Sequence, residues 1–299
     1  MLSRYLRLFS FNLLFITVTA ASAFTFFYCT SNADAQDETG NGDNFQFDSY
    51  MRYIPARSVK AMSGEVEIIE SDADCSYELK AFDKLPVKFS LNEQHIGIEN
   101  TTDVELPAHL VGLATDIETT LPFFSFEDTY LRLGVSPSFY SDDWDCASSN
   151  FRIPSRYFLI FIPNDKWTFI GGIGVYPDFE TAVFPILGFI YKPNDKLSFN
   201  ITPKRPNISY LLNKRVRLFA EGGMSFDEFE VTKDSQENVV LSYKKKYLGS
   251  GVEFKFNKFI KSSVTVGGVF NRSLKYRDSL GKVNMKSSLY TEFRVQISI

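Results

Sequence analysis

The sequence predicts an all-β protein: a closed antiparallel transmembrane β-barrel of about 12 strands, with 10 or 14 also open. Three observations predict it. The C-terminal half consists of successive hairpins whose strands alternate in polarity, and the chain starts with a segment typical of export. In addition, its 30 Phe and 15 Tyr suit strands and the aromatic belts that barrels place at both membrane interfaces. The even strand number follows the rule for bacterial barrels.

Residues 1–35 have the pattern of a secretory signal peptide. Arg4 and Arg7 precede an apolar run over 8–28, and an Ala-Asp-Ala cleavage motif ends at residue 35. The long apolar run also fits a membrane anchor, but the cleavage motif that follows it favours removal. Beyond residue 35 the sequence has no run of 18 apolar residues. Any later crossing of a membrane must therefore use strands, and in lipid only a closed barrel satisfies their backbone groups.

The N-terminal half of the barrel is harder to assign than the C-terminal half. Residues 36–49 are polar and Gly-rich, which predicts a flexible lead-in before a barrel over 50–299. Residues 61–102 contain β-leaning runs with Asp-rich and Asn-rich breaks between them. Residues 105–122 fit either a strand or a short helix folded into the barrel as a plug, and we favour the strand.

Repeated short turns organise the part that follows residue 127. The tetrapeptide Pro-Asn-Asp-Lys occurs at 163–166 and 193–196, and related turns occur at 212–215 and 256–259. Asn and Asp favour such turns because their side chains bond the local backbone. Most of the connections between these turns are longer and polar. Transmembrane barrels have this asymmetry, with short turns in the periplasm and long loops outside the cell.

Each strand in this region has one apolar and one polar face. In 289–299, for example, Phe293 and Val295 lie on the face opposite Glu292 and Arg294. A soluble barrel with its apolar face inside would alternate in the same way; the export segment, the strand at the C-terminus and strand lengths near 9–11 residues favour the membrane. The predicted lumen-lining residues are Arg215, Arg217, Glu221, Glu253, Lys255, Lys261, Glu292 and Arg294. They could pair across strands and fill the lumen, or line a water-filled passage.

Several runs carry a resemblance to a known family. Residues 186–200, 206–213 and 217–223 resemble a family of uncharacterised bacterial outer-membrane β-barrel proteins, and 247–256 fits its strand–turn–strand pattern. The resemblance covers roughly residues 150–299 and implies the barrel fold but no activity. Barrels of the outer membrane commonly end on an aromatic residue that the assembly machinery reads, whereas this sequence ends on Ile299.

Few residues suit catalysis or metal binding. Cys75 and Cys146 lie in Asp-rich segments that we expect to be loops, and in an exported protein they predict a disulfide. A weaker hypothesis is a Ca²⁺ site formed by the neighbouring carboxylates Asp72, Asp74, Asp142, Asp143 and Asp145. His95 and His109 are the two histidines, and neither lies in a hydrolase motif, so we do not expect an enzyme or a cofactor.

The charge distribution argues against a nucleic-acid surface over the whole molecule. Residues 36–150 contain 22 Asp/Glu and 7 Lys/Arg, whereas 151–299 contain 13 and 23, which indicates a polarised interior or loop face. We therefore expect a porin-like protein of the bacterial outer membrane, with membrane lipid and the barrel-assembly machinery as partners. Its expected function is a channel or passive transporter for small solutes. The alternative is a structural or adhesive barrel with acidic surface loops and no transport.

Overall fold

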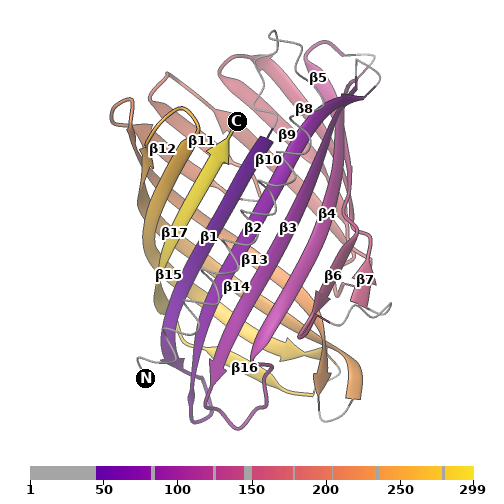
Figure 1. The fold of residues 1–299 in the computed structure, drawn as a ribbon, viewed down its shortest axis with the longest axis vertical. Coiled ribbons are helices and arrows are strands. Elements are labelled where there is room, and N and C mark those ends of the chain that lie inside the picture. The colour runs from indigo at the N-terminus through magenta and orange to yellow at the C-terminus, as the bar shows by residue number, and fades with distance from the viewer. Residues whose placement is uncertain are drawn as a thin grey trace.

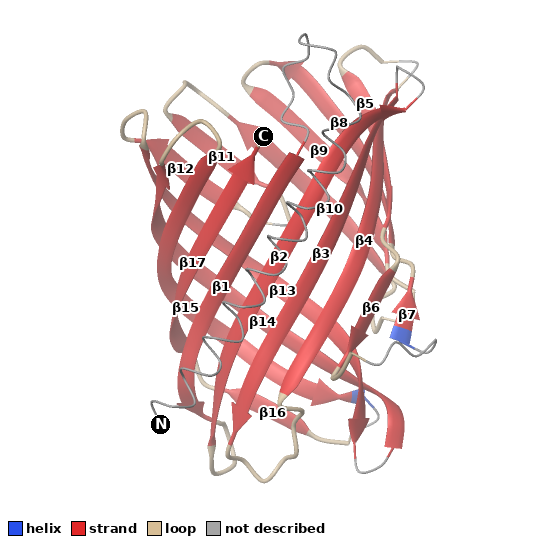
Figure 2. Cartoon of the chain, in the orientation of Figure 1, coloured by secondary structure: helices blue, strands red, loops and turns tan. Residues whose placement is uncertain are grey.

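The structure is a computed structural model that describes residues 45–81, 85–123, 126–144, 150–177, 179–203, 205–233, 236–277 and 280–299. Its elements are β1 (Phe45–Ser58), β2 (Glu65–Ala81), β3 (Leu85–Asn100), β4 (His109–Pro122), β5 (Thr129–Val135), β6 (Ser138–Ser141), β7 (Phe151–Arg152), β8 (Ser155–Asn164), β9 (Trp167–Val175), β10 (Val183–Tyr191), β11 (Leu197–Ile201), β12 (Asn207–Leu211), β13 (Val216–Lys233), β14 (Gln236–Lys255), β15 (Ile260–Tyr276), β16 (Lys282–Met285) and β17 (Ser288–Ser298). Strands dominate the described chain (Figure 2). Within it, no helix has the length and apolarity to span a membrane. The expected signal peptide, 1–35, lies outside the described residues.

The strands form one sheet that closes into a barrel (Figure 1). Closure occurs where β1 pairs with β17, and the backbone groups of Phe45 and Ile299 bond each other at the rim. We call this rim, at the top of Figure 1, the terminal end, and the opposite rim the far end. The ladders around the ring are antiparallel, and β6 adds a single parallel bridge to β13.

Three positions in the ring are interrupted. β5 and β6 are two pieces of one strand position, because both pair with β4. On their other side, β8 pairs with β5 and β7 pairs with β6, so β7 and β8 also share one position. β16 and β17 share a third position, because both pair with β15. Pro137 and Pro154 stand at two of these breaks, as expected for a residue that cannot donate to a ladder. Of the 17 strands, three are therefore second pieces, and the ring has 14 positions.

The expected number of 12 strands is therefore wrong, and 14, which the sequence left open, is the number. β11 and β12 have only five residues each, less than a membrane crossing needs. A strand count that relies on the length of a membrane crossing therefore misses them. β1 starts at Phe45, inside the segment expected to be a lead-in. Residues 105–122, which were ambiguous, contain the strand β4, as we favoured.

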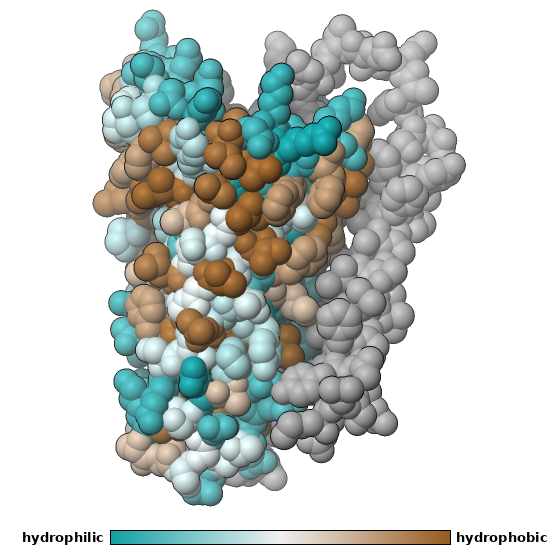
Figure 3. All heavy atoms as spheres, turned by 90° about the vertical axis from the view of Figure 1, so that its left-hand side faces the viewer, coloured by the Kyte–Doolittle hydropathy of each residue, from teal (hydrophilic) through white to brown (hydrophobic). Residues whose placement is uncertain are grey.

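The two halves of the barrel have opposite polarity. In the half near the terminal end, exposed apolar side chains such as Leu248, Val266 and Leu289 cover the outside. In the far half the apolar side chains are inside, where Ile54, Phe229 and 16 other residues form one buried cluster. Figure 3 shows hydrophobic residues mainly over the upper and middle parts of one face, with hydrophilic residues at the top rim and towards the bottom. β13 and β14 have 18 and 20 residues, more than one crossing requires, so their excess length builds the far half.

Tyr290 marks the boundary between the polar and apolar parts of the interior. Its ring lies over two inward-facing glycines on neighbouring strands: a Cβ on Gly249 would come within 2.2 Å of the Tyr290 hydroxyl, and one on Gly267 within 2.5 Å of the ring. These glycines let a large ring lie flat across the wall. The ring thereby fills the interior at this level.

Candidate functional site

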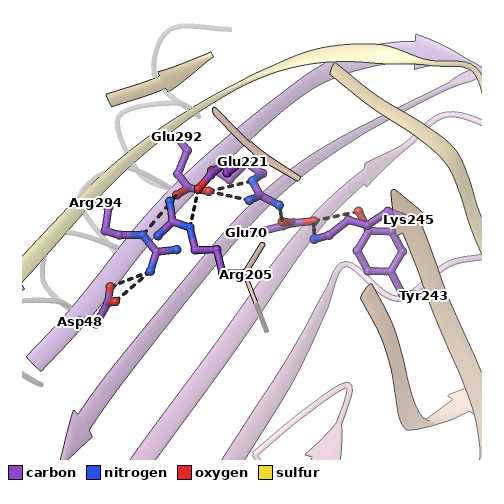
Figure 4. Close-up of polar contacts among 9 residues, drawn as sticks. Asp48, Glu70, Arg205, Glu221, Tyr243, Lys245, Glu292 and Arg294 are labelled. Atoms are coloured by element: carbon purple, nitrogen blue, oxygen red, sulfur yellow. Dashed lines mark hydrogen bonds and ion pairs between the residues drawn. The ribbon is translucent and has the colours of Figure 1, made fainter. Parts of the chain in front are cut away.

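A cluster of charged side chains crosses the lumen just above the apolar core. Figure 4 shows it: Asp48, Glu70, Arg205, Glu221, Tyr243, Lys245, Glu292 and Arg294 converge from both sides of the barrel. Together with Arg52, we call these residues the charge layer. Four of them are acidic and four are basic, so at neutral pH the layer has no net charge. The alternation of the strands explains their position, because each wall residue of the layer is on the lumen face of its strand.

Arg52 is the centre of the charge layer. Its guanidinium donates to Glu292 at 2.6 and 3.1 Å and to Glu70 at 3.4 Å. The rings of Tyr247 and Tyr290 lie 4.4 and 4.8 Å from the guanidinium carbon, which adds cation–π contacts. Arg52 and both carboxylates are almost fully buried, and such charges persist in a protein interior only when paired.

Glu70 connects β2 to β14. It accepts hydrogen bonds from the ammonium of Lys245 and, at 2.8 Å, from the hydroxyl of Tyr243. Both partners are buried. Glu70 thus links the charge layer to the apolar core, of which Tyr243 is a member.

Arg205 is the one basic member of the layer that comes from a loop. It lies between β11 and β12, folds into the lumen, and donates to Glu221 at 2.5 Å and to Glu292 at 3.3 Å. Its side chain is 24% exposed, whereas those of Glu221 and Glu292 are 1% and 0% exposed. Arg205 therefore covers the two carboxylates on the side that faces the open part of the lumen.

Arg294 completes the layer towards the terminal end. Its guanidinium bonds both carboxylate oxygens of Asp48 at 2.9 Å and approaches Glu292 at 3.3 Å. Gln296 donates to the same Asp48 at 2.9 Å. The contacts join β1 to β17 across the closure of the barrel.

Other polar side chains on the lumen wall are only partly buried. Arg156 on β8 donates to Asp116 at 2.6 Å and lies 3.1 Å from Glu118, yet these inward side chains remain 19–23% exposed. Partly exposed side chains on the inside of a barrel require accessible space there. We call this space the vestibule.

The predicted lumen residues divide between the charge layer and the vestibule. Glu221, Glu292 and Arg294 are in the layer. Arg217 and Glu253 form an ion pair at 3.2 Å nearer the terminal end, where Lys255 pairs in register with Lys261. Arg215 is in the short turn before β13.

Sequence reasoning missed Asp48, Arg52, Glu70, Arg205 and Lys245. Alternation within β1, β2 and β14 places four of them on the lumen face, and this signal was available. Their pairing was not, because it joins residues as much as 240 positions apart.

The predicted disulfide and cation site receive no support from the described residues. Cys75 is within β2 rather than in a loop, and it lies on the outer face; Cys146 lies outside the described residues, as does Asp145. Asp72 and Asp74 alternate with Cys75 and face the lumen, whereas Asp142 and Asp143 follow β6. Within the described ranges, no group of three or more His, Cys, Asp or Glu is arranged to hold a metal.

The two histidines lie side by side on the outer face of the barrel. His95 on β3 and His109 on β4 stack with their ring centres 6.2 Å apart. His95 is opposite Ser71 in the ladder, but its Nδ1 has no hydrogen-bond partner. This geometry contains no hydrogen-bonded serine–histidine pair.

Several solved structures are similar to this chain in fold. They include a KdgM porin (14% identity, TM-score 0.36, covering 85% of this chain and 99% of that one) and an outer membrane channel from Pseudomonas putida F1 (9%, 0.44, 89% and 100%). LpxR from Salmonella typhimurium is another (7%, 0.39, 85% and 100%). None of these similarities carries an activity to this chain. A search of curated proteins finds no match.

The family assignment comes from the sequence. The model of a domain of unknown function, DUF6268, matches residues 131–297, which is more than half of the chain. The match includes β6 to β16 and nearly all of β17, and with them the charge-layer residues from Arg205 to Arg294. The chain therefore belongs to the DUF6268 family of outer-membrane-type β-barrels, whose function is unknown.

Proposed function

We propose that this protein is a gated channel of the bacterial outer membrane that passes small polar solutes, and that its gate is closed in this structure. The apolar outer surface near the terminal end supports contact with lipid. The short turns at that end favour the periplasmic side, and the longer loops at the far end favour the outside of the cell.

One observation supports the gate: Arg205, which belongs to a loop, pairs with two carboxylates of the charge layer and closes it. The other charges of the layer belong to strands that the barrel ladders hold in place. A loop can withdraw without breaking a ladder, and withdrawal of Arg205 would expose Glu221 and Glu292 to the vestibule. The vestibule would supply water for a conducting state, in which the apolar side chains that fill the far half would also have to move aside.

Single-channel recording in planar bilayers tests this proposal. Wild-type protein should open rarely. In Arg205→Ala, the open probability should rise about tenfold, the change expected when the closed state loses roughly 1.4 kcal/mol. The matched control is Arg132→Ala, because Arg132 also faces the lumen but bonds only Thr120 near the rim. Equal behaviour of both variants would contradict the gate.

A second candidate is a structural or adhesive barrel without transport. The observation that favours it is the apolar core of the far half, which fills the interior beyond the charge layer. A protein of this kind would remain silent in bilayers in both the wild-type and the Arg205→Ala form, even though its heat-dependent gel mobility shows that it is folded.

A further inference from the structure

The inner wall over β8, β9 and β10 is apolar, unlike the rest of the vestibule. Phe158, Gly172 and Ile186 form one row across the three strands, and Ile160 with Ile170 belongs to the next row towards the terminal end. The outer face of the same strands is also apolar, with Leu159, Phe169 and Leu187 exposed. Lumen faces of membrane barrels are normally polar, so this wall departs from the usual pattern.

The wall of the barrel has a gap next to this region. β12 pairs with β13 only from Leu211 to Asn207, which is opposite Glu221. β13 continues to Lys233, and along that edge the described chain contributes the bond from Gly222 to Pro206, the bridge from Glu230 to Ser141 and the bond from the Thr232 N–H to Asp142. The β9–β10 loop also contacts this edge, where the Glu180 N–H donates to Glu228, but residues 223–229 have no ladder partner there in the described chain. An open strand edge is costly against lipid unless protein or another polar group covers it.

Apolar side chains line both sides of the gap. Met224 and Phe226 project from the outer face of β13 and are 63% and 46% exposed. Phe184, from the inner face of β10, packs 6.4 Å from the ring of Phe226. The inner wall of β10 therefore meets the outer face of β13 here. We call the apolar surface formed by Phe184, Ile186, Met224 and Phe226 the side slot.

The far side of the slot is basic. Lys244 lies 4.6 Å from the ring centre of Phe226, Lys246 is the exposed neighbour opposite Met224, and Lys275 is on the next strand. Glu180 in the β9–β10 loop binds Lys244 at 2.8 Å and Lys275 at 3.7 Å. Three ammonium groups against one carboxylate leave an excess of positive charge beside an apolar opening.

We propose that the side slot binds an anionic membrane lipid. An acyl chain enters between β12 and β13 and lies against Phe184, Ile186 and Met224, while Lys244 and Lys246 contact the phosphate. The slot is at the boundary between the apolar belt and these lysines, the level at which a lipid headgroup lies. The binding does not depend on the proposed gate.

Tryptophan quenching by brominated acyl chains tests the site. Trp144 and Trp167 are first replaced by Phe, and a single tryptophan is introduced by Ile186→Trp (inner wall) or Leu187→Trp (outer face, 78% exposed). The proteins are placed in vesicles in which either phosphatidylglycerol or phosphatidylcholine carries the bromine. The Leu187→Trp protein should be quenched equally by both lipids. For the Ile186→Trp protein, half of the maximal quenching should need a fraction of brominated phosphatidylglycerol about fivefold lower than the fraction of brominated phosphatidylcholine that has the same effect.

Two further variants keep the proposal open to refutation. Lys244→Gln with Lys246→Gln should remove the preference for phosphatidylglycerol and leave the Leu187→Trp signal unchanged. Phe184→Trp, also on the inner face of β10, reports on the slot if Ile186→Trp does not fold. Absence of quenching at both slot positions, with normal quenching at Leu187→Trp, would overturn the site. Equal quenching by both lipids would overturn the assignment of an anionic headgroup.

Discussion

Arg52 makes polar contacts that join three strands of the charge layer. It joins β1 to Glu70 on β2 and to Glu292 on β17, and two tyrosine rings enclose it. Burial makes the layer sensitive to the loss of Arg52, because Glu70 and Glu292 would each lose one of their cations in a place that water reaches poorly.

We therefore expect Arg52→Met to lower the free energy of unfolding by about 3 kcal/mol, since it leaves buried carboxylates short of a cation. Urea unfolding in detergent micelles measures the change. Arg132→Met is the control and should change stability by less than about 0.5 kcal/mol, because Arg132 is exposed. Similar losses in both variants would show that the charge layer does not stabilise the barrel.

The two adjacent glycines of β15 differ in their surroundings. A Cβ on Gly267 would meet the Leu248 carbonyl at 2.3 Å and the Tyr290 ring at 2.5 Å, whereas one on Gly268 would meet nothing closer than 3.9 Å. We expect Gly267→Ala to destabilise the barrel by about 1–3 kcal/mol and Gly268→Ala to be nearly neutral. The same unfolding measurement separates them, and equal effects would contradict the packing of Tyr290.

At the scale of elements, a hydrogen bond and two ion pairs hold the connection between β9 and β10 against β13, β14 and β15. The backbone N–H of Glu180 donates to Glu228 at 3.2 Å, and its carboxylate binds Lys244 and Lys275. The hydrogen bond and the positive charge of Lys244, followed by Lys275, lower the pKa of Glu180 below that of an ordinary glutamate.

Because the pKa of Glu180 is lowered in the folded state, its ion pairs stabilise the connection fully above the pKa of an unfolded glutamate. This stabilisation is lost as the pH falls through the folded-state pKa. We expect the hydrogen-exchange protection factors of residues 179–182, which correct for the intrinsic exchange rate at each pH, to fall on acidification into that range. In Glu180→Gln, the protection factors should be low already at neutral pH and should respond less to acid. An unchanged pH response in the variant would show that other groups hold the connection.

The sequence predicted the strands better than it predicted the contacts between them. The Pro-Asn-Asp-Lys turns and the alternation in 289–299 led to strands that the structure contains, because both signals are local. The Asp-rich segment around Asp72 and Asp74 suggested a loop, but those carboxylates face a polar lumen and the strand continues through them. The role of Arg205 could not be predicted, because nothing near it in sequence indicates that the loop folds inwards.

At the scale of the whole molecule, the inside and the outside exchange polarity along the barrel axis. The half near the terminal end has the surface of a membrane protein, and the far half has the core of a soluble one. The alternation of a strand is the same in both halves, so periodicity alone could not separate a membrane barrel from a soluble barrel. The two kinds of barrel can be told apart by which face of a long strand such as β14 is apolar at each point along its length.

Single cysteines in a background without Cys75 and Cys146 test this arrangement in intact cells. We expect a membrane-impermeant maleimide to label Lys282→Cys at the far end and to leave Val266→Cys unlabelled in the lipid belt. Lys258→Cys, in a turn at the terminal end, should react only after the outer membrane is permeabilised. Labelling of Lys258→Cys but not Lys282→Cys in intact cells would reverse the proposed orientation.

The pairing of β1 with β17 has a consequence for biogenesis. The first described strand cannot find its final neighbour until the last one has been synthesised, and contacts this distant in sequence form slowly. Until then both ribbons present unsatisfied backbone edges that invite association with other chains. We therefore expect a nascent polypeptide of this design to need shielding from other chains, and we expect the ion pairs Arg52–Glu292 and Arg294–Asp48 to join the seam only at the final step.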